Sequence, residues 1–441
     1  MRRIYCVVLL ACAFLVSCGD DEGFTFSPTP AAVLVVVNAI PASPSLTLEV
    51  NNRTAGTISF GENTGSTDVL PQIPLDFRVS FFNNGINQTV LDDQFTLDID
   101  FNQVIILTGS VDSATAVKVV EPPFSYPDGS TDTRIRFMNA TSNVASATLT
   151  ITNPNGIDAT VAMTNGQPTG FSTTAAGGGV QIEIRDTSSN ALLWRSGEFI
   201  LSAGADRFFL LGDYFGPGDG TVRMTSINDP SGTSLFLNEE IPSGIRFINQ
   251  TANQGQLDFL VDGAVAASLN FGEASDFIEF EQSAVIVSVT PAGDATTEFD
   301  SIERLLFSGV FASNHAAVSI DGTGVGTSFY TEDRRPIDTQ ARVNVTKLAP
   351  VIPLVDLYFQ DAGESLTGGP DLSSLADFTS GPLSIPPNTY DIFVTEAGTT
   401  NILIGPQTIT VESLGVYTIQ IVEAAGGGEP IQLALLDDFQ N

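Results

Sequence analysis

The sequence predicts an all-β protein made of four tandem antiparallel β-sandwich domains. Runs of β-branched and aromatic residues are short and end in clusters of Gly, Asn, Asp or Pro, and helical periodicity is scarce. Turn pairs such as Asp262-Gly263 and Asp321-Gly322 separate alternating apolar runs, which is the chemistry of β-hairpins. Four segments also begin alike, at intervals of about 100 residues, which is the size of one sandwich domain.

Each copy of this repeat opens with a strand that ends at one anchor residue, namely Asn38, Asn139, Asn249 or Lys347. Apolar residues recur at the same three positions after the anchor in every copy, spaced two residues apart. They are Leu46, Leu48 and Val50; Ala147, Leu149 and Ile151; Leu257, Phe259 and Val261; and Val355, Leu357 and Phe359. A period of two predicts a strand with one buried face.

A second shared feature lies further along each copy. Phe60-Gly61-Glu62 and Phe271-Gly272-Glu273 stand at the same distance from their anchors in the first and third copies. We align Phe171 of the second copy and Phe378 of the fourth copy with Phe60. The later position of Phe378 predicts an inserted loop around residues 363–370.

The N-terminus predicts export and lipid attachment. Two arginines precede an apolar run over residues 4–16, which is too short to span a bilayer and is typical of a secretory signal. The run ends in Leu15-Val16-Ser17-Cys18, which resembles the bacterial lipobox, whose cysteine becomes the lipidated first residue of the mature chain. A plain signal peptide that happens to end in Ser-Cys is the alternative. Because Gly19 stands where an aspartate would resemble an inner-membrane retention signal, we expect an outer-membrane lipoprotein, periplasmic or surface-exposed.

These features divide the chain into six predicted parts. They are a signal peptide (1–17), the lipidated Cys18 with a flexible tether (18–31), and sandwiches at 32–127, 128–238, 239–336 and 337–441. Polar stretches at residues 126–133, 228–243 and 331–340 join the sandwiches. Units of this size can each bury a core, unlike short solenoid repeats. We therefore expect separate domains, arranged like beads on a tether.

The charge of the chain excludes one class of partner. The sequence has 17 basic and 51 acidic residues, a net charge of −34, and loss of Arg2 and Arg3 with the signal gives 15 − 51 = −36. A chain without a basic patch is not expected to bind nucleic acid. Nor is it expected to bind anionic lipid through lysines, so its predicted membrane contact is the lipid on Cys18. Cys6 and Cys12 leave with the signal, so no disulfide is expected.

Residues that could support catalysis or metal binding are few. His315 is the only histidine, so any Ser-His-Asp triad would have to use it, and we expect it to be structural. Trp194 is the only tryptophan, and we expect it in the core rather than exposed for sugar stacking. Two acidic pairs could hold calcium but lack the spacing of a calcium loop: Asp128 with Asp132, and Asp213 with Asp219. We therefore expect no catalytic residue and no cofactor, and leave weak calcium binding open.

The third and fourth copies carry a strong family resemblance, which is weaker in the first copy and weakest in the second. The segment LAPVIPLVDLYFQDAG of the fourth copy resembles the signature of a bacterial β-sandwich repeat family of unknown function, His-Ala-Ser-Pro-x-Ala-Pro-x-Val-Asp-Val-Tyr-Val-Asp-Gly. The third copy, with LDFLVDG, is similar to the second half of that signature, and the resemblance extends over residues 32–441. It implies secretion and an immunoglobulin-like fold, with no known reaction. The signature aspartate is kept as Asp258 and Asp356 but is Thr47 and Thr148 in the first two copies, and its histidine is absent from all four.

We expect a lipid-anchored cell-envelope protein that acts as a non-catalytic binding or adhesion module for an unknown protein or glycan. A structural spacer or periplasmic scaffold without a specific ligand is the alternative, and a hydrolytic enzyme is the least favoured interpretation. Loop length distinguishes a binding module from a spacer, because a binding module should have one copy with longer loops and a spacer should have four plain copies. The predicted insertion at residues 363–370 favours binding by the fourth domain.

Overall fold

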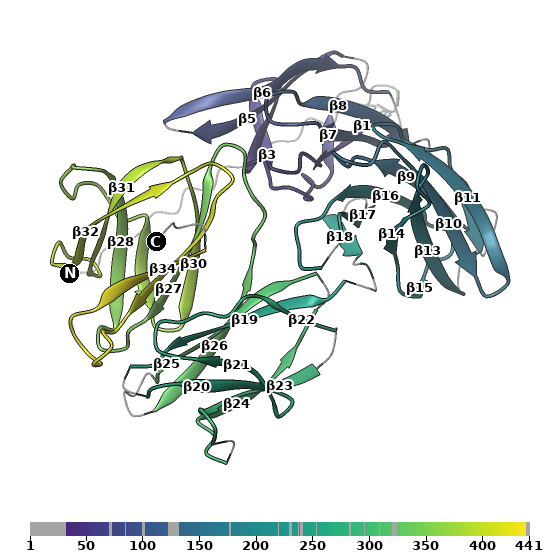
Figure 1. The fold of residues 1–441 in the computed structure, drawn as a ribbon. Coiled ribbons are helices and arrows are strands. Elements are labelled where there is room, and N and C mark those ends of the chain that lie inside the picture. The colour runs from purple at the N-terminus through teal and green to yellow at the C-terminus, as the bar shows by residue number, and fades with distance from the viewer. Residues whose placement is uncertain are drawn as a thin grey trace, which may run out of the picture.

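A computed structural model describes residues 32–69, 73–83, 85–98, 102–121, 132–175, 178–218, 220–228, 232–236, 238, 241–252, 254–281, 284–294, 296–307, 309–319 and 324–437 (Figure 1). These residues contain strands and turns, and no helix among them is long and apolar enough to cross a membrane. Their strands form four successive immunoglobulin-like sandwiches of two sheets each, which confirms the predicted all-β fold.

The first unit contains strands β1 (Ala32–Asn38), β2 (Leu46–Val50), β3 (Arg53–Ile58), β4 (Thr67–Val69), β5 (Leu75–Asn83), β6 (Ile86–Phe95), β7 (Asn102–Thr108) and β8 (Thr115–Glu121). The second contains β9 (Asp132–Asn139), β10 (Ser146–Asn153), β11 (Gly156–Thr164), β12 (Ser172–Ala175), β13 (Gly179–Asp186), β14 (Leu192–Arg195), β15 (Phe199–Ile200), β16 (Asp206–Asp213), β17 (Val222–Asn228) and β18 (Gly232–Phe236).

The third unit contains β19 (Ser243–Gln250), β20 (Leu257–Val261), β21 (Ala264–Leu269), β22 (Ile278–Phe280), β23 (Ala284–Pro291), β24 (Asp300–Leu305), β25 (Phe311–Val318) and β26 (Val325–Glu332). The fourth contains β27 (Ala341–Leu348), β28 (Leu354–Asp361), β29 (Leu372–Ala376), β30 (Thr379–Ile385), β31 (Asn388–Glu396), β32 (Ile402–Val411), β33 (Val416–Val422) and β34 (Gln432–Asp437).

All four units share one topology. We call the sheet that holds the first strand of each unit its seam sheet; the four are β4-β1-β7-β8, β12-β9-β16-β17-β18, β22-β19-β25-β26 and β30-β27-β33-β34. The facing outer sheets are β3-β2-β5-β6, β11-β10-β13-β14 with β15 on β13, β21-β20-β23-β24 and β29-β28-β31-β32. The outer sheets are antiparallel, whereas each seam sheet contains one parallel strand pair: β1 with β7, β9 with β16, β19 with β25, and β27 with β33.

A hydrophobic core fills the space between the two sheets of each unit. The apolar residues that recur with a period of two after each anchor all lie in or against these cores, so the strand prediction is confirmed. Trp194 on β14 is fully buried in the core of the second unit, which confirms its expected place.

Neighbouring units pack against one another, so the expectation of separate domains on a tether was wrong. A further apolar cluster lies between the seam sheets of the first two units, with Val35 and Val37 of β1 packed near Met138, Phe208 and Leu210. The intervening residues Leu34 and Val36 face the core of their own unit. A strand buried on both faces needs no polar alternation. The first and second units therefore share an apolar interface.

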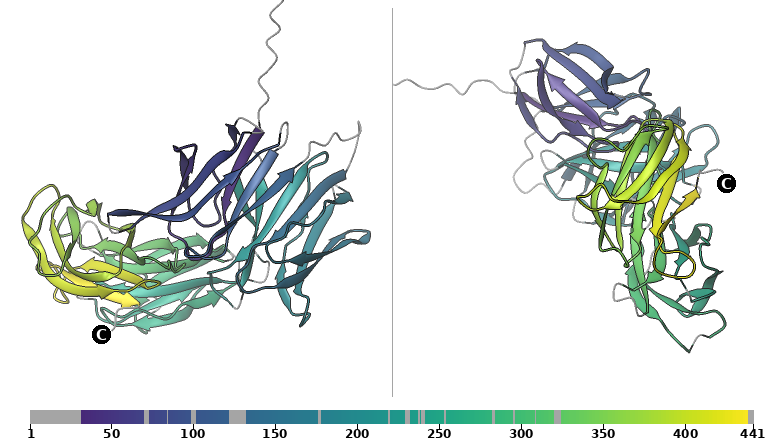
Figure 2. Two further views of the ribbon diagram at one scale, coloured as in Figure 1. Left: turned by 90° about the horizontal axis from the view of Figure 1, so that it is seen from above. Right: turned by 90° about the vertical axis from the view of Figure 1, so that its left-hand side faces the viewer.

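The third and fourth units also meet through their seam sheets, but this interface is mostly polar. A small apolar cluster of Ala317, Leu348 and Val422 lies beside a network of charged and amide side chains. The linker that leads into β27 contacts the first unit as well, since the Arg335 guanidinium donates to the carbonyls of Pro41 and Ser43 (2.9 and 2.8 Å). The two pairs of units thus touch each other (Figure 2).

The anchor residues close the turn that follows the first strand. The Asn38 amide donates to the Ser43 hydroxyl (2.9 Å) and accepts from the Ile40 N–H (3.0 Å). Asn139 and Asn249 accept from the N–H two residues further on, in the same way. Lys347 closes its turn by donating to the Ala349 carbonyl (2.7 Å). All four are fully buried, so the role of this position is structural.

The structure corrects the alignment of two copies. The anchor carbonyl accepts a backbone hydrogen bond from Gly61, Gly166, Gly272 and Phe378 in the four units (2.7–2.9 Å). Each of these four residues has a positive φ. Gly166 is therefore the second-unit equivalent of Gly61, so the alignment of Phe171 with Phe60 was wrong. In the fourth unit, Phe378 is the equivalent of Gly61 and not of Phe60. The predicted insertion is confirmed, since residues 362–371 form a mostly exposed loop between β28 and β29.

We expect that replacing Asn314 on β25 with an apolar residue stabilises the protein. Its side chain is fully buried and has no hydrogen-bond partner among the described residues. The pairings with the first strands place it opposite Phe247, where the other units have Ile105, Phe209 and Ile419. Asn314→Ile should raise the free energy of unfolding by about 1–3 kcal/mol, because it removes an unsatisfied buried amide. Urea unfolding measures this change. The control variant Asn314→Asp should lower the free energy of unfolding. A lower free energy of unfolding in Asn314→Ile would contradict the prediction.

Candidate binding sites between the domains

A recess with a volume of about 850 Å³ lies between the first and second units. We call it the hydroxyl groove. The turn after β7 lines one side, and the loop after β9 with the turn at residues 165–167 lines the other. Its polar side chains are hydroxyls and amides, contributed by Thr108, Ser110, Ser113, Thr115, Thr141, Ser142, Asn143, Asn165 and Gln167. None of the residues that line it carries a charge.

Hydrogen bonds fix the walls of the hydroxyl groove. Ser110 and Ser113 share a hydrogen bond across the turn after β7 (2.7 Å). On the other wall, Asp213 at the end of β16 accepts from the Ser142 N–H and hydroxyl (3.0–3.1 Å). Asp213 is 4% exposed, and burial raises its pKa despite these two donors. Asp213 therefore holds a loop of the groove in place.

Each of the two predicted calcium pairs has one member outside the described residues, so the structure does not test them. Asp132 lies exposed at the start of β9, while Asp128 and Asp219 lie outside the described residues. Within the described part of the chain, no group of three or more His, Cys, Asp or Glu side chains is placed to hold a metal ion. Weak calcium binding stays an untested expectation. The predicted signal peptide and Cys18 also lie outside the described residues.

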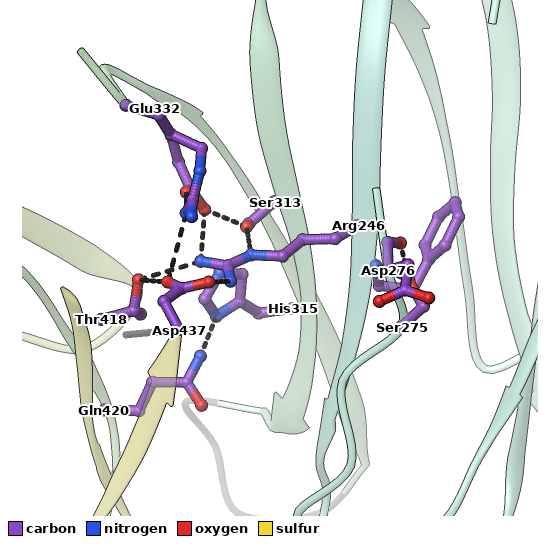
Figure 3. Close-up of polar contacts among 11 residues, drawn as sticks. Arg246, Ser275, Asp276, Ser313, His315, Glu332, Thr418, Gln420 and Asp437 are labelled. Atoms are coloured by element: carbon purple, nitrogen blue, oxygen red, sulfur yellow. Dashed lines mark hydrogen bonds and ion pairs between the residues drawn. The ribbon is translucent and has the colours of Figure 1, made fainter. Parts of the chain in front are cut away.

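A buried polar network occupies the interface between the third and fourth units (Figure 3). Arg246 of β19 donates to Ser313 (2.7 Å), Thr418 (2.9 Å), Glu332 (2.9 Å) and Asp437 (2.6 Å). The side chains of Arg246, Glu332 and Asp437 are at most 10% exposed. Burial raises the pKa of Asp437, but Arg246 and a second guanidinium outweigh it, so the pKa lies below its usual range.

The second guanidinium of this network belongs to Arg334, which lies 3.2 Å from both Glu332 and Asp437. Two arginines thus face two carboxylates in a site of low solvent exposure. The arrangement is electrically balanced and fully engaged in contacts across the interface. It offers no unsatisfied acid or base to a substrate.

His315 belongs to the same interface, in the middle of β25 rather than beside a turn. It is 2% exposed, and the Gln420 amide donates to its Nδ1 (3.0 Å). Gln250 donates in turn to the Gln420 carbonyl oxygen (2.7 Å), which fixes the orientation of that amide. Burial, with a smaller contribution from Arg246, lowers the pKa of His315 to about 3. The imidazole is therefore neutral and serves as a hydrogen-bond acceptor.

The neutral His315 predicts a pH-dependent stability. Its ordinary pKa is 6.5 and its folded value is about 3, so between these values the unfolded chain binds a proton that the folded chain does not. The free energy of unfolding should fall as the pH drops through this window, by about 2–3 kcal/mol from this group at pH 4.5. His315→Gln should lose correspondingly less stability between pH 7 and pH 4.5. Urea titrations at the two pH values measure this, and equal losses in both proteins would contradict it.

The aspartates that match the family signature also have structural partners. Asp258 accepts from the Ser268 hydroxyl (2.5 Å) and the Gly293 N–H (2.8 Å). Asp356 accepts from the N–H groups of Ser374 and Gly398 (2.7 Å each). Asp258 thus links β20 to β21 and to the turn after β23, and Asp356 links β28 to β29 and to the turn after β31. These hydrogen bonds give both carboxylates a structural role.

Solved structures that resemble the chain include two whose likeness is weak. No family model and no curated protein matches the chain. The Bacillus anthracis TIE protein is similar over 88% of this chain and 67% of its own, with 11% identity and a TM-score of 0.16. A candidate cell adhesion protein from Bacteroides eggerthii is similar over 46% of this chain and 96% of its own, with 8% identity and a TM-score of 0.21. Likenesses at these TM-scores assign neither a ligand nor an activity.

Proposed function

We propose that the chain is a lipid-anchored cell-envelope protein whose paired sandwiches form a non-catalytic binding module for a neutral glycan. The hydroxyl groove is the observation that carries this proposal. Sugar hydroxyls both donate and accept hydrogen bonds, and the Ser, Thr, Asn and Gln side chains of the groove do the same. The groove lacks charged lining residues, and the net charge of −34 repels anionic polymers.

The walls of the groove are held by two units that share an apolar interface. A preorganised site loses less conformational entropy when a ligand binds. The fixed turn at Ser110 and the loop tethered by Asp213 supply that preorganisation. Attachment through Cys18 would hold this module at the outer membrane, where extracellular or periplasmic glycans are accessible.

A structural spacer remains a second candidate, and a specific observation favours it. The seam sheets are joined pairwise and the linker before β27 is bonded to the first unit, so the described units support one another. Such a body could project or scaffold other proteins without any ligand. It would tolerate substitutions in the groove without loss of function.

A neutral-glycan array probed with the purified full-length chain tests the proposal. Binding should be lost, by about tenfold or more, in the variant Asn143→Ala/Gln167→Ala, because each residue offers both a donor and an acceptor to the groove. The matched control is Asn87→Ala/Gln88→Ala on the exposed strand β6, which should bind like the parent. Absence of binding to any glycan, or equal binding by both variants, would overturn the proposal and favour the spacer.

A further inference from the structure

A second recess lies where three units and a linker meet, and it is unlike the hydroxyl groove. Its volume is about 210 Å³. The turn after β3 contributes Phe60, the second unit contributes Tyr214, Phe215 and Arg223, and β25 contributes Phe311. Glu332 at the end of β26 and residues 333–335 of the linker complete the wall. We call this the arginine recess, because arginines gather at it in a chain with 17 basic and 51 acidic residues.

Arg223 of β17 has unused hydrogen-bonding capacity. Its guanidinium lies 4.1 Å from the centroid of the Phe60 ring. It makes no hydrogen bond or ion pair with any residue that the structure describes, although a guanidinium carries five N–H donors. Burial lowers its pKa to about 10, and Asp333 and Asp213 compensate only in part. Arg246, by contrast, bonds four side chains in the interface of the third and fourth units.

Further arginines lie close to Arg223. Arg335 donates to two neutral backbone carbonyls, and its pKa is lowered to about 10 by burial first and then by Arg342, with Arg223 adding to the repulsion. Arg342 pairs with Asp333 (2.9 Å), whose side chain is 59% exposed. Arg334 and Glu332 belong to the balanced network and neutralise each other. The guanidinium groups of Arg223, Arg335 and Arg342 all interact with the Asp333 carboxylate. Asp213 adds a smaller attraction on Arg223, and Asp338 adds one on Arg335.

We propose that the arginine recess binds an organic carboxylate about one ring in size. A guanidinium fork matches the two oxygens of a carboxylate, and Arg223 has its donors free for that contact among the described residues. Phe60, Phe215 and Phe311 provide apolar surface for the body of the ligand. The recess is smaller than pockets for drug-sized ligands, which exceed roughly 300 Å³. The strongly negative chain disfavours multivalent anions, which points to a single carboxylate.

Binding at this place would join parts of the protein that are distant in sequence. The recess is lined by the first, second and third units and by the linker into the fourth. A ligand that binds the assembled junction and not the unfolded chain raises the stability of the assembly by mass action. Carboxylate binding should therefore raise the unfolding temperature of the full chain. The arginine recess and the hydroxyl groove share no lining residue. A negative result for carboxylate binding would therefore leave the glycan proposal intact, and a negative result for glycan binding would leave the carboxylate proposal intact.

Calorimetry and thermal unfolding of the full-length chain test the proposal. The probes are sodium benzoate and sodium glucuronate, each compared with phosphate and with chloride at matched ionic strength. At least one of the two carboxylates should bind with one-to-one stoichiometry and raise the unfolding temperature. Arg223→Met should weaken this binding by about tenfold or more, because a charged hydrogen-bonded pair is lost. Arg223→Lys should give an intermediate loss, since the charge remains without the fork.

Arg53→Met on the exposed face of β3 is the matched control and should bind like the parent. Because Arg223→Met removes a half-buried charge without an ion partner among the described residues, that variant should fold at least as stably as the parent. Equal effects of carboxylates and chloride, binding retained in Arg223→Met, or binding of phosphate alone would each overturn the proposal.

Discussion

Arg246→Met is expected to lower the free energy of unfolding by about 3 kcal/mol or more. Methionine keeps much of the aliphatic volume of arginine but removes all four hydrogen bonds to side chains of the interface. Glu332 and Asp437 would then share Arg334 alone, which leaves one buried carboxylate without a counter-charge. Removal of one partner from a buried ion network is costly because the remaining charge cannot be hydrated.

Urea unfolding at pH 7 measures this effect, and Arg78→Met is its control. Arg78 of β5 also pairs with two carboxylates, Glu49 (3.8 Å) and Asp92 (3.1 Å), but its side chain is 45% exposed. Exposed pairs contribute about 0–1 kcal/mol, so the control should differ little from the parent. If both variants lost the same small amount of stability, the third and fourth units would not depend on the buried network.

In both pairs of units the seam sheets pack against each other, but one interface is apolar and the other is mostly polar. The first and second units bury Val35, Val37 and Phe208 in an apolar contact, which tolerates small shifts. The third and fourth units bury a charged network whose members must all find partners, and such a network is costly when half satisfied. The polar interface should therefore restrict the relative orientation of its units more strictly than the apolar one does.

The sequence predicts each sandwich better than it predicts the pairing of sandwiches. The period of two after each anchor depends on burial within one unit, so it marks the outer strands correctly. The continuous apolar run of β1, AVLVVVN, is the signal that this strand is buried on both faces, and it could have indicated the shared interface. The isolated Arg246 in the apolar strand SGIRFINQ is a similar signal. Its partner Asp437 lies 191 residues away, and no sequence pattern connects the two.

The misaligned second and fourth copies have a local explanation. The turn requires a positive φ and a backbone N–H aimed at the anchor carbonyl, and neither depends on an aromatic side chain. Gly166 meets both requirements without a phenylalanine before it. Phe378 adopts the same conformation at φ 54°, which a bulky residue rarely does, and packs against the apolar cluster of the third and fourth units. A match on phenylalanine alone could not separate these cases.

Lys347→Asn is expected to cost about 3 kcal/mol of unfolding free energy at pH 7, although asparagine is the anchor residue of the other three units. Lys347 is fully buried and forms an ion pair with Asp377, whose side chain is 9% exposed. Burial lowers the pKa of Lys347 and raises that of Asp377, with the pairing opposing both shifts. Without the ammonium group, the buried Asp377 carboxylate loses its counter-charge.

The double variant Lys347→Asn/Asp377→Asn should recover most of this loss. It reproduces the second unit, where Asn139 is the anchor and Asn165 stands just before the turn residue. A double-mutant cycle measured by urea unfolding should therefore give a coupling energy of about 2–3 kcal/mol between the two positions. Additive losses would show that the ion pair does not account for lysine at this anchor.

The single variant should also depend on pH. Burial raises the pKa of Asp377 above its ordinary value of 3.8, and Lys347 opposes this shift in the parent. Loss of Lys347 should therefore raise this pKa further, so that the folded variant is stabilised by protonation of Asp377 at low pH and loses this contribution as the pH rises. The cost of Lys347→Asn should therefore be smaller at pH 4 than at pH 7, whereas the double variant should show no such difference. A pH-independent cost would mean that the lysine acts through packing or the Ala349 carbonyl rather than through its charge. The anchor position thus accepts either an amide that closes the turn by itself or an ammonium that requires a carboxylate beside it.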